Sequence, residues 1–136
     1  MDGIRIVTAV SVALVRDRQV LLVRRARPPA QGLYAFPGGR VEPEETLEQA
    51  ARRELLEETG LTAGPLARFQ QIDIEAEPEG EPVAFRLTVF TGEPRDGEPV
   101  AGDDADTVEW FELDELAALP LTDPTMRAAL EILAMR

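Results

Sequence analysis

Apolar residues cluster or alternate with polar ones in five stretches of the chain, which we expect to be β-strands. Residues 4–15 are rich in β-branched side chains, which favour extended backbone. Residues 19–25 follow after the short polar segment Arg16-Asp17-Arg18, so the two stretches are expected to form a hairpin. The second of them is apolar on both faces, which favours a central strand. Further along, the pattern predicts strands at 70–76, 83–92 and 107–111.

The clearest helix is predicted at residues 46–59. Thr46 is a suitable N-cap and Gly60 a suitable C-terminal stop. Glutamates before and inside the first turn lie near the positive end of the helix dipole. Two more helices are expected at 112–119 and 123–136, the second with Asp123 as its cap and Pro124 at its first helical position.

The order of these elements predicts the fold class. Loops are expected at 26–39, 77–82 and 93–106, and the chain shows neither an internal repeat nor a long linker. We therefore expect one domain over residues 1–136, of the α/β (α+β) class. It would be an α/β/α sandwich, with helices covering both faces of a mixed β-sheet.

The absence of three residue types narrows the chemistry. The chain has no cysteine and no histidine, and all 14 basic residues are arginines. This excludes a Cys/His zinc site, a cysteine nucleophile, a Ser-His-Asp triad and a P-loop lysine. A general base must then be Asp, Glu or Tyr, and a bound metal must accept oxygen ligands, as Mg²⁺, Mn²⁺ and Ca²⁺ do.

Charge is distributed unevenly between the two halves. Residues 1–68 carry 10 arginines and 9 acids, whereas residues 69–136 carry 4 arginines and 17 acids, for a net charge of −12. Such a chain repels long nucleic acid, whereas a small phosphate ester could still bind where arginines and a metal meet. There is no apolar run of the ~18 residues that span a bilayer and no signal-peptide pattern. We therefore expect a cytoplasmic protein with no membrane partner.

Three carboxylates share one side of the predicted helix. At 100° per residue, Glu57 and Glu58 lie about 60° and 40° to either side of Glu54. The alternative interpretation is an acidic face exposed to solvent. It fits poorly, because the three carboxylates lie on the same side of the helix as small and apolar residues. Like charges at this spacing also repel unless a counter-ion is present. We therefore expect a divalent cation, with the preceding Phe36-Pro37-Gly38-Gly39-Arg40 turning sharply through positive φ to aim a carbonyl at it.

The segment from Gly39 to Leu61 resembles the Nudix box. All nine constrained positions of that 23-residue motif match: Gly39, Glu45, Arg53, Glu54, Leu55, Glu57, Glu58, Gly60 and Leu61. The Phe-Pro-Gly-Gly before the box and the segment 108–116 after it are also similar to bacterial members. The resemblance implies an α/β/α sandwich that hydrolyses a nucleoside diphosphate linked to another group X, using Mg²⁺ or Mn²⁺.

The resemblance also implies roles for individual residues. Glu54, Glu57 and Glu58 would bind the metal together with the carbonyl of Gly38 or Gly39. Arg53 would orient a glutamate, and Glu45 would act on the ligands without binding the metal itself. The general base could be a glutamate of the box or an acid of the later loop, and we rank Glu57 and Glu54 first. The acids of that loop are Glu93, Asp96, Glu98, Asp103 and Asp104.

Substrate contacts are expected from the residues between the second strand and the box. Arg24, Arg25 and Arg27 are candidates for the phosphates, and Tyr34 for stacking on a base. Phe36 and Trp110 could also stack, but core packing suits them better. The favoured substrate is a small soluble nucleotide, either an ADP-ribose-like nucleotide sugar or a nucleoside triphosphate. Pro78 is similar in position to a proline found downstream of the box in ADP-ribose hydrolases.

Two other classes of function are alternatives to hydrolysis. One is a non-catalytic, nucleotide-sensing Nudix-like module, which the intact box disfavours. The other is a structural Ca²⁺ site, but no stretch has the alternating ligands of an EF-hand loop. The net charge disfavours capped RNA as a substrate. The sequence does not decide whether the protein forms a homodimer.

Overall fold

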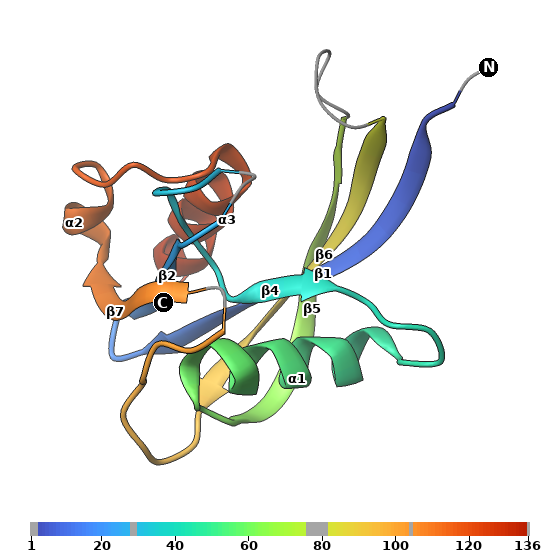
Figure 1. The fold of residues 1–136 in the computed structure, drawn as a ribbon. Coiled ribbons are helices and arrows are strands. Elements are labelled where there is room, and N and C mark those ends of the chain that lie inside the picture. Colours follow the sequence, from blue (N-terminus) through green and yellow to red (C-terminus); the bar gives the residue numbers. More distant parts are fainter. Residues whose placement is uncertain (1–2, 28–29, 76–81, 104, 136) are drawn as a thin grey trace.

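The computed structural model describes residues 3–27, 30–75, 82–103 and 105–135 (Figure 1). It has seven strands and three helices in the described part of the chain. In order they are β1 (Arg5–Arg16), β2 (Gln19–Arg25), β3 (Tyr34–Ala35), β4 (Gly38–Arg40), α1 (Leu47–Thr59), β5 (Ala63–Ile74), β6 (Val83–Pro94), β7 (Ala105–Glu112), α2 (Leu113–Leu116) and α3 (Asp123–Ala134).

The sheet is mixed, and β1 lies at its centre. β1 runs parallel to β6, from the pair Arg5 and Val83 to the pair Leu14 and Gly92. Between the other strands of the described residues the pairings are antiparallel: β5 with β6, β4 with the middle of β1, β2 with the end of β1, and both β3 and β7 with β2. β1 therefore connects the strands at one end of the molecule with those at the other.

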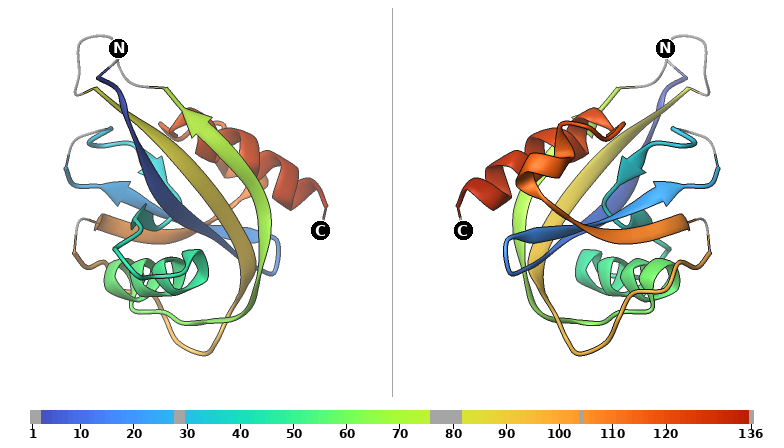
Figure 2. Two further views of the ribbon diagram at one scale, coloured as in Figure 1. Left: turned by 90° about the vertical axis from the view of Figure 1, so that its right-hand side faces the viewer. Right: turned by 90° about the vertical axis from the view of Figure 1, so that its left-hand side faces the viewer.

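Side chains that alternate along β1 build two hydrophobic cores. Val12 and Leu14 pack with the α1 residues Ala50, Ala51 and Leu55 on one face. On the other face, Ala13 and Val15 join the cluster that includes α3 residues Ala128, Ala129 and Ile132. Figure 2 shows the strands lying between α1 and α3. The expected sandwich with a mixed sheet is therefore confirmed.

Several predicted boundaries were wrong. The expected loop 26–39 contains β3 and the start of β4, which are too short to leave a periodic pattern. β5 begins at Ala63 instead of residue 70, and α2 is only one turn long. The cap of α3 is Thr122, so Pro124 takes the second helical position. The expected turn at 77–82, with Pro78, lies outside the described residues except for Pro82.

None of the helices within the described ranges is long and apolar enough to cross a membrane.

Candidate active site

Strand β4 comes unusually close to both of its neighbours. A Cβ atom on Gly38 would lie 2.2 Å from the carbonyl oxygen of Val10, and one on Gly39 would lie 2.4 Å from Oε2 of Glu54. Neither glycine has positive φ, since the described glycines with positive φ are Gly32, Gly60 and Gly97. The expectation of a sharp turn through positive φ was therefore wrong. Glycine is needed here because β1 and a helix glutamate leave no room for a side chain.

Helix α1 begins and ends where the sequence predicts. Thr46 and Gln49 form a capping box, with the Gln49 amide donating to the Thr46 hydroxyl at 3.1 Å and the Thr46 amide donating to the Gln49 side chain at 2.9 Å. Gly60 ends the helix in the left-handed conformation. These caps fix where the helix starts and stops, and hence the positions of its glutamates.

The three helix glutamates differ in their exposure to water. The Glu57 side chain is 43% exposed and that of Glu54 12%, whereas Glu58 is buried. The helix therefore presents a graded set of carboxylates, with Glu57 on the water side and Glu58 against the protein.

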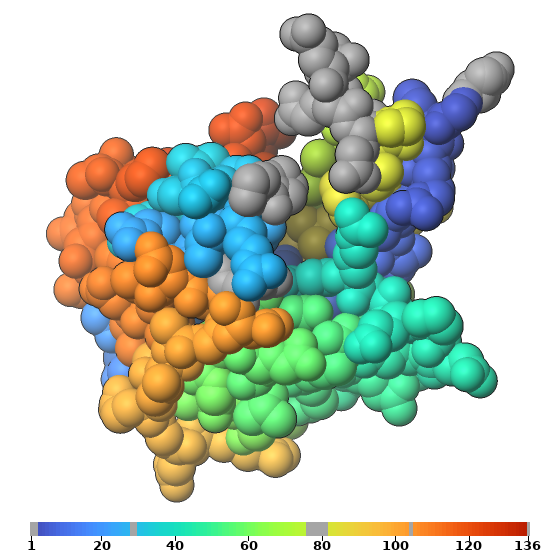
Figure 3. Space-filling model, viewed as in Figure 1, coloured from blue at the N-terminus to red at the C-terminus, as the bar shows by residue number. Residues whose placement is uncertain are grey.

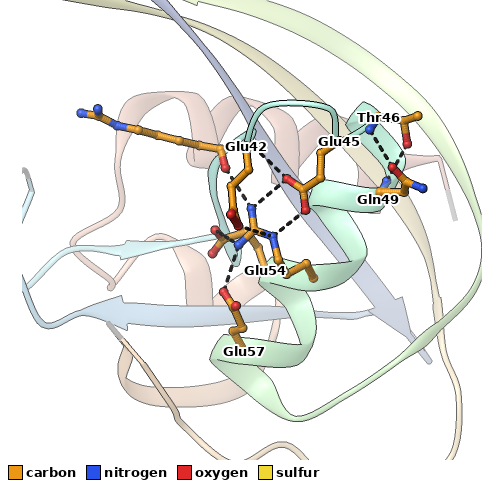
Figure 4. Close-up of polar contacts among 8 residues, drawn as sticks. Glu42, Glu45, Thr46, Gln49, Glu54 and Glu57 are labelled. Atoms are coloured by element: carbon orange, nitrogen blue, oxygen red, sulfur yellow. Dashed lines mark hydrogen bonds and ion pairs between the residues drawn. The ribbon is translucent and has the colours of Figure 1, made fainter.

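Arg53 joins the carboxylates of the helix to the loop before it. Figure 4 shows Glu42 and Glu45 of that loop beside Glu54 and Glu57 of the helix. The Arg53 guanidinium donates to both oxygens of Glu45, at 2.6 and 3.0 Å. It also donates to Glu54 at 2.9 Å, to Glu57 at 3.1 Å and to the backbone carbonyl of Arg40 at 3.1 Å. One side chain thus holds α1, β4 and the intervening loop in a fixed relation.

The charges within this network support one another. Hydrogen bonds from Arg53 and from the Glu42 amide lower the pKa of Glu45. The carboxylates of Glu45 and Glu54 raise the pKa of Arg53, so its guanidinium stays charged. Glu45 thus holds Arg53 from the loop before the helix.

Burial has a larger effect on Glu58 than the positive charge near it. Burial raises its pKa to about 9, with a further contribution from the hydrogen bond and the charge of Glu54. The Gly38 amide and the charge of Arg25 act in the opposite direction but are weaker. Without added positive charge, the proton on Glu58 is therefore retained at neutral pH.

The donor set has the chemistry that a divalent cation requires. Carboxylate oxygens of α1 lie beside the backbone of β4, and such hard oxygens suit Mg²⁺ and Mn²⁺. Within the described residues, no three of these side chains already surround a common point in a way that could hold a metal ion. Arg53 now satisfies two of the three glutamates. The residues fit a cation by type and location, and their side chains would have to rearrange to bind it.

The predicted substrate residues occupy different environments. Arg24 forms an ion pair with Asp106, whereas Arg25 lies near enough to Glu58 to lower its pKa. Arg27 is exposed. The half-buried Tyr34 ring meets Phe111 edge-on at 5.4 Å, so its ring is partly used in packing. Of these four residues, Arg25 is the one whose charge contributes to the pKa shift of Glu58.

The other two aromatic candidates belong to the hydrophobic cores, and the described loop acids are exposed. Phe36 is buried in the core on the α3 face, and Trp110 packs on the α1 face beneath the Arg16 guanidinium, 4.3 Å from its ring centre. The loop acids Glu93, Asp96, Glu98 and Asp103 are exposed, and Asp104 lies outside the described residues.

Two residues of this region escaped the sequence analysis. Glu42 lies 3.2 Å from Arg53, and the Arg40 side chain lies over the Phe85 ring at 5.5 Å. Both precede the helix, where no periodicity relates sequence position to direction. The only signal was their place inside the box, at positions that the motif does not constrain. Figure 3 shows the surface hollowed above α1, between the segment that follows β2 and strands β1 and β6.

Comparison with known proteins gives concordant matches. A family model described as a NUDIX domain matches residues 5–131. The ADP-ribose pyrophosphatase of Methanocaldococcus jannaschii is 38% identical over 112 residues, which are 82% of this chain and 64% of that protein. The oxidized purine nucleoside triphosphate hydrolase of Danio rerio is 37% identical over 105 residues, which are 77% of this chain and 65% of that protein. The chain thus spans just under two thirds of these curated relatives.

One solved structure is similar over nearly the whole chain. The crystal structure of a MutT NUDIX hydrolase from Burkholderia pseudomallei has a TM-score of 0.84 and 32% sequence identity. The match covers 93% of this chain and 97% of that one.

Proposed function

This chain belongs to the Nudix hydrolase family, and on that basis we propose that it hydrolyses a diphosphate bond in a nucleoside diphosphate linked to a second group, with Mg²⁺ or Mn²⁺ as cofactor. The observation that carries the proposal is the meeting of α1 and β4. There, Arg53 links Glu45, Glu54 and Glu57, while Glu58 is buried beside them.

Each of these residues has a role in the proposed reaction. Glu54, Glu57, Glu58 and the carbonyl of Gly38 or Gly39 would hold the cation. When bound, a divalent cation neutralises diphosphate charge and makes a bound water more acidic. Glu57 is the most exposed of the three carboxylates, so we assign it first as the general base, with Glu54 second.

Arg53 and Glu45 act as positioning residues. Arg53 holds Glu54 and Glu57 on one side of the helix through charge-assisted hydrogen bonds. Glu45 holds Arg53 in turn, with both of its oxygens engaged. Neither residue needs to touch the substrate to affect the rate.

The substrate we propose is a small soluble nucleotide, either ADP-ribose-like or a nucleoside triphosphate. The names of the two relatives point to one of these classes each. Arg25, whose charge acts on Glu58, is the first candidate for a phosphate contact. Further candidates nearby in the sequence are Arg24, Arg27 and Tyr34. The net charge of −12 disfavours long RNA.

A substrate panel tests the proposal. ADP-ribose, other nucleotide sugars, dinucleoside polyphosphates and nucleoside triphosphates are each incubated with the protein and Mg²⁺, and the products are identified. We expect Glu57→Gln to lower kcat by about 10²–10³-fold. Glu48→Gln is the matched control, because Glu48 lies on the same helix but pairs with Arg52 at an exposed position. Nucleotide binding without turnover would favour the sensing module instead.

A further inference from the structure

The loop between β6 and β7 covers the C-terminal end of α1. The last carbonyls of a helix have no partner within it and must find one elsewhere. Here the Gly102 amide donates to the carbonyl of Glu58 at 3.1 Å, and the Val100 amide donates to that of Thr59 at 2.8 Å. Figure 1 shows this loop curving past that end of the helix. A segment far away in sequence thus completes the helix turn that carries Glu57 and Glu58.

Gly102 lies directly against the backbone of the last turn of α1. A Cβ atom at position 102 would lie 2.7 Å from the backbone carbonyl oxygen of Glu57. The φ of Gly102 is not positive, so glycine is required here by space and not by conformation. A methyl group would have to be accommodated by a backbone shift of roughly 0.7 Å to reach the 3.4 Å of ordinary contact.

We infer that residues 95–102 clamp the last turn of α1 and thereby position Glu57 and Glu58, and that Gly102 is the positioning residue on which the clamp depends. A second anchor supports this, because the Arg95 amide donates to the carbonyl of Thr62 at 2.9 Å, just beyond the helix. The inference rests on the proposed function for its effect on turnover. The effect on metal binding can be measured without any substrate.

The test compares Gly102→Ala with Gly64→Ala. Gly64 is the matched control, because a Cβ atom there would have 3.8 Å to its nearest neighbour, the Glu93 carbonyl oxygen. Mn²⁺ affinity is measured on the metal-free full chain by electron paramagnetic resonance, and kcat is measured with the best nucleotide of the panel. We expect Gly102→Ala to weaken Mn²⁺ binding roughly tenfold and to lower kcat by about ten- to a hundredfold. Gly64→Ala should change neither.

The outcomes separate a positioning role from a merely structural one. A Gly102→Ala protein that melts earlier but binds Mn²⁺ and turns over like the wild type overturns the inference. If the wild type hydrolyses no nucleotide in the panel, the proposed function fails, while the Mn²⁺ affinities still decide the clamp. If Gly102→Ala does not fold, hydrogen exchange on the wild type decides instead: unprotected amides at Val100 and Gly102 would overturn the inference, and protection matching the last turn of α1 would support it.

Discussion

Arg53 is the side chain whose removal should disturb the glutamates most. It makes five hydrogen bonds to Glu45, Glu54, Glu57 and the backbone of Arg40. We expect Arg53→Ala to lower kcat by about 10²-fold, because Glu54 and Glu57 lose the group that orients them. Arg86→Ala is the control, since Arg86 is exposed on β6 and pairs only with Asp73 in the described part of the chain. Equal losses for both variants would contradict the assignment.

Glu58 should make the stability of the metal-free protein depend on pH. Its pKa is raised from 4.5 to about 9 on folding, so the folded state binds the proton more tightly than the unfolded chain does. The stabilisation is fully present below pH 4.5 and is lost as the pH rises towards 9. In chelator, we expect the wild type to lose on the order of a few kcal/mol of stability across this range. Glu58→Gln, measured by urea unfolding at several pH values, should show a much flatter dependence.

Adding Mg²⁺ provides a second measurement of the ionisation of Glu58. The added positive charge should stabilise the wild type most at the alkaline end, where the carboxylate is already ionised. A wild-type protein whose stability is independent of pH in chelator would mean that Glu58 is not protonated in the metal-free state.

At the scale of elements, the helix caps can be separated from the chemistry. Thr46→Ala removes the hydroxyl that accepts from the Gln49 amide, which should cost about 1 kcal/mol of unfolding free energy. Thr46→Ser keeps the hydroxyl and should cost much less. Because Glu54, Glu57 and Glu58 lie beyond the first turn of α1, and Arg53 still holds Glu54 and Glu57 when the cap is lost, kcat should stay close to that of the wild type. A large loss of kcat without loss of stability would show that the cap itself belongs to the site.

The elements that the sequence predicts well are those with local signals. The caps and the periodicity of α1 lie within one stretch, so its bounds follow from the sequence. The three-residue β4 has no such pattern, and the reason for Gly38 and Gly39 depends on Val10 and Glu54, which are distant in sequence. The contact of Gly102 with the end of α1 is equally non-local. The caps and bounds of α1 were thus predictable, whereas the contacts made by Gly38, Gly39 and Gly102 were not.

At the scale of the whole molecule, fold and metal should be independent. The two hydrophobic cores lie on the two faces of the sheet and are built of apolar side chains, so we expect the chain to fold without a cation. Excess chelator should abolish turnover and leave the far-UV circular dichroism spectrum nearly unchanged. Full activity in chelator would refute the metal mechanism, and global unfolding would make the metal structural.

The parallel pairing of β1 with β6 has a consequence for how the chain folds. The N-terminal strand pairs with residues 83–92 over most of its length, so it cannot gain this partner until most of the chain has been synthesised. Closing such a long loop before its contacts form makes folding slow. A nascent chain that ends before β6 leaves the apolar residues of β1 without this partner, which is the condition under which strands associate with other chains. For this protein, the vulnerable period on the ribosome therefore extends until β6 has emerged.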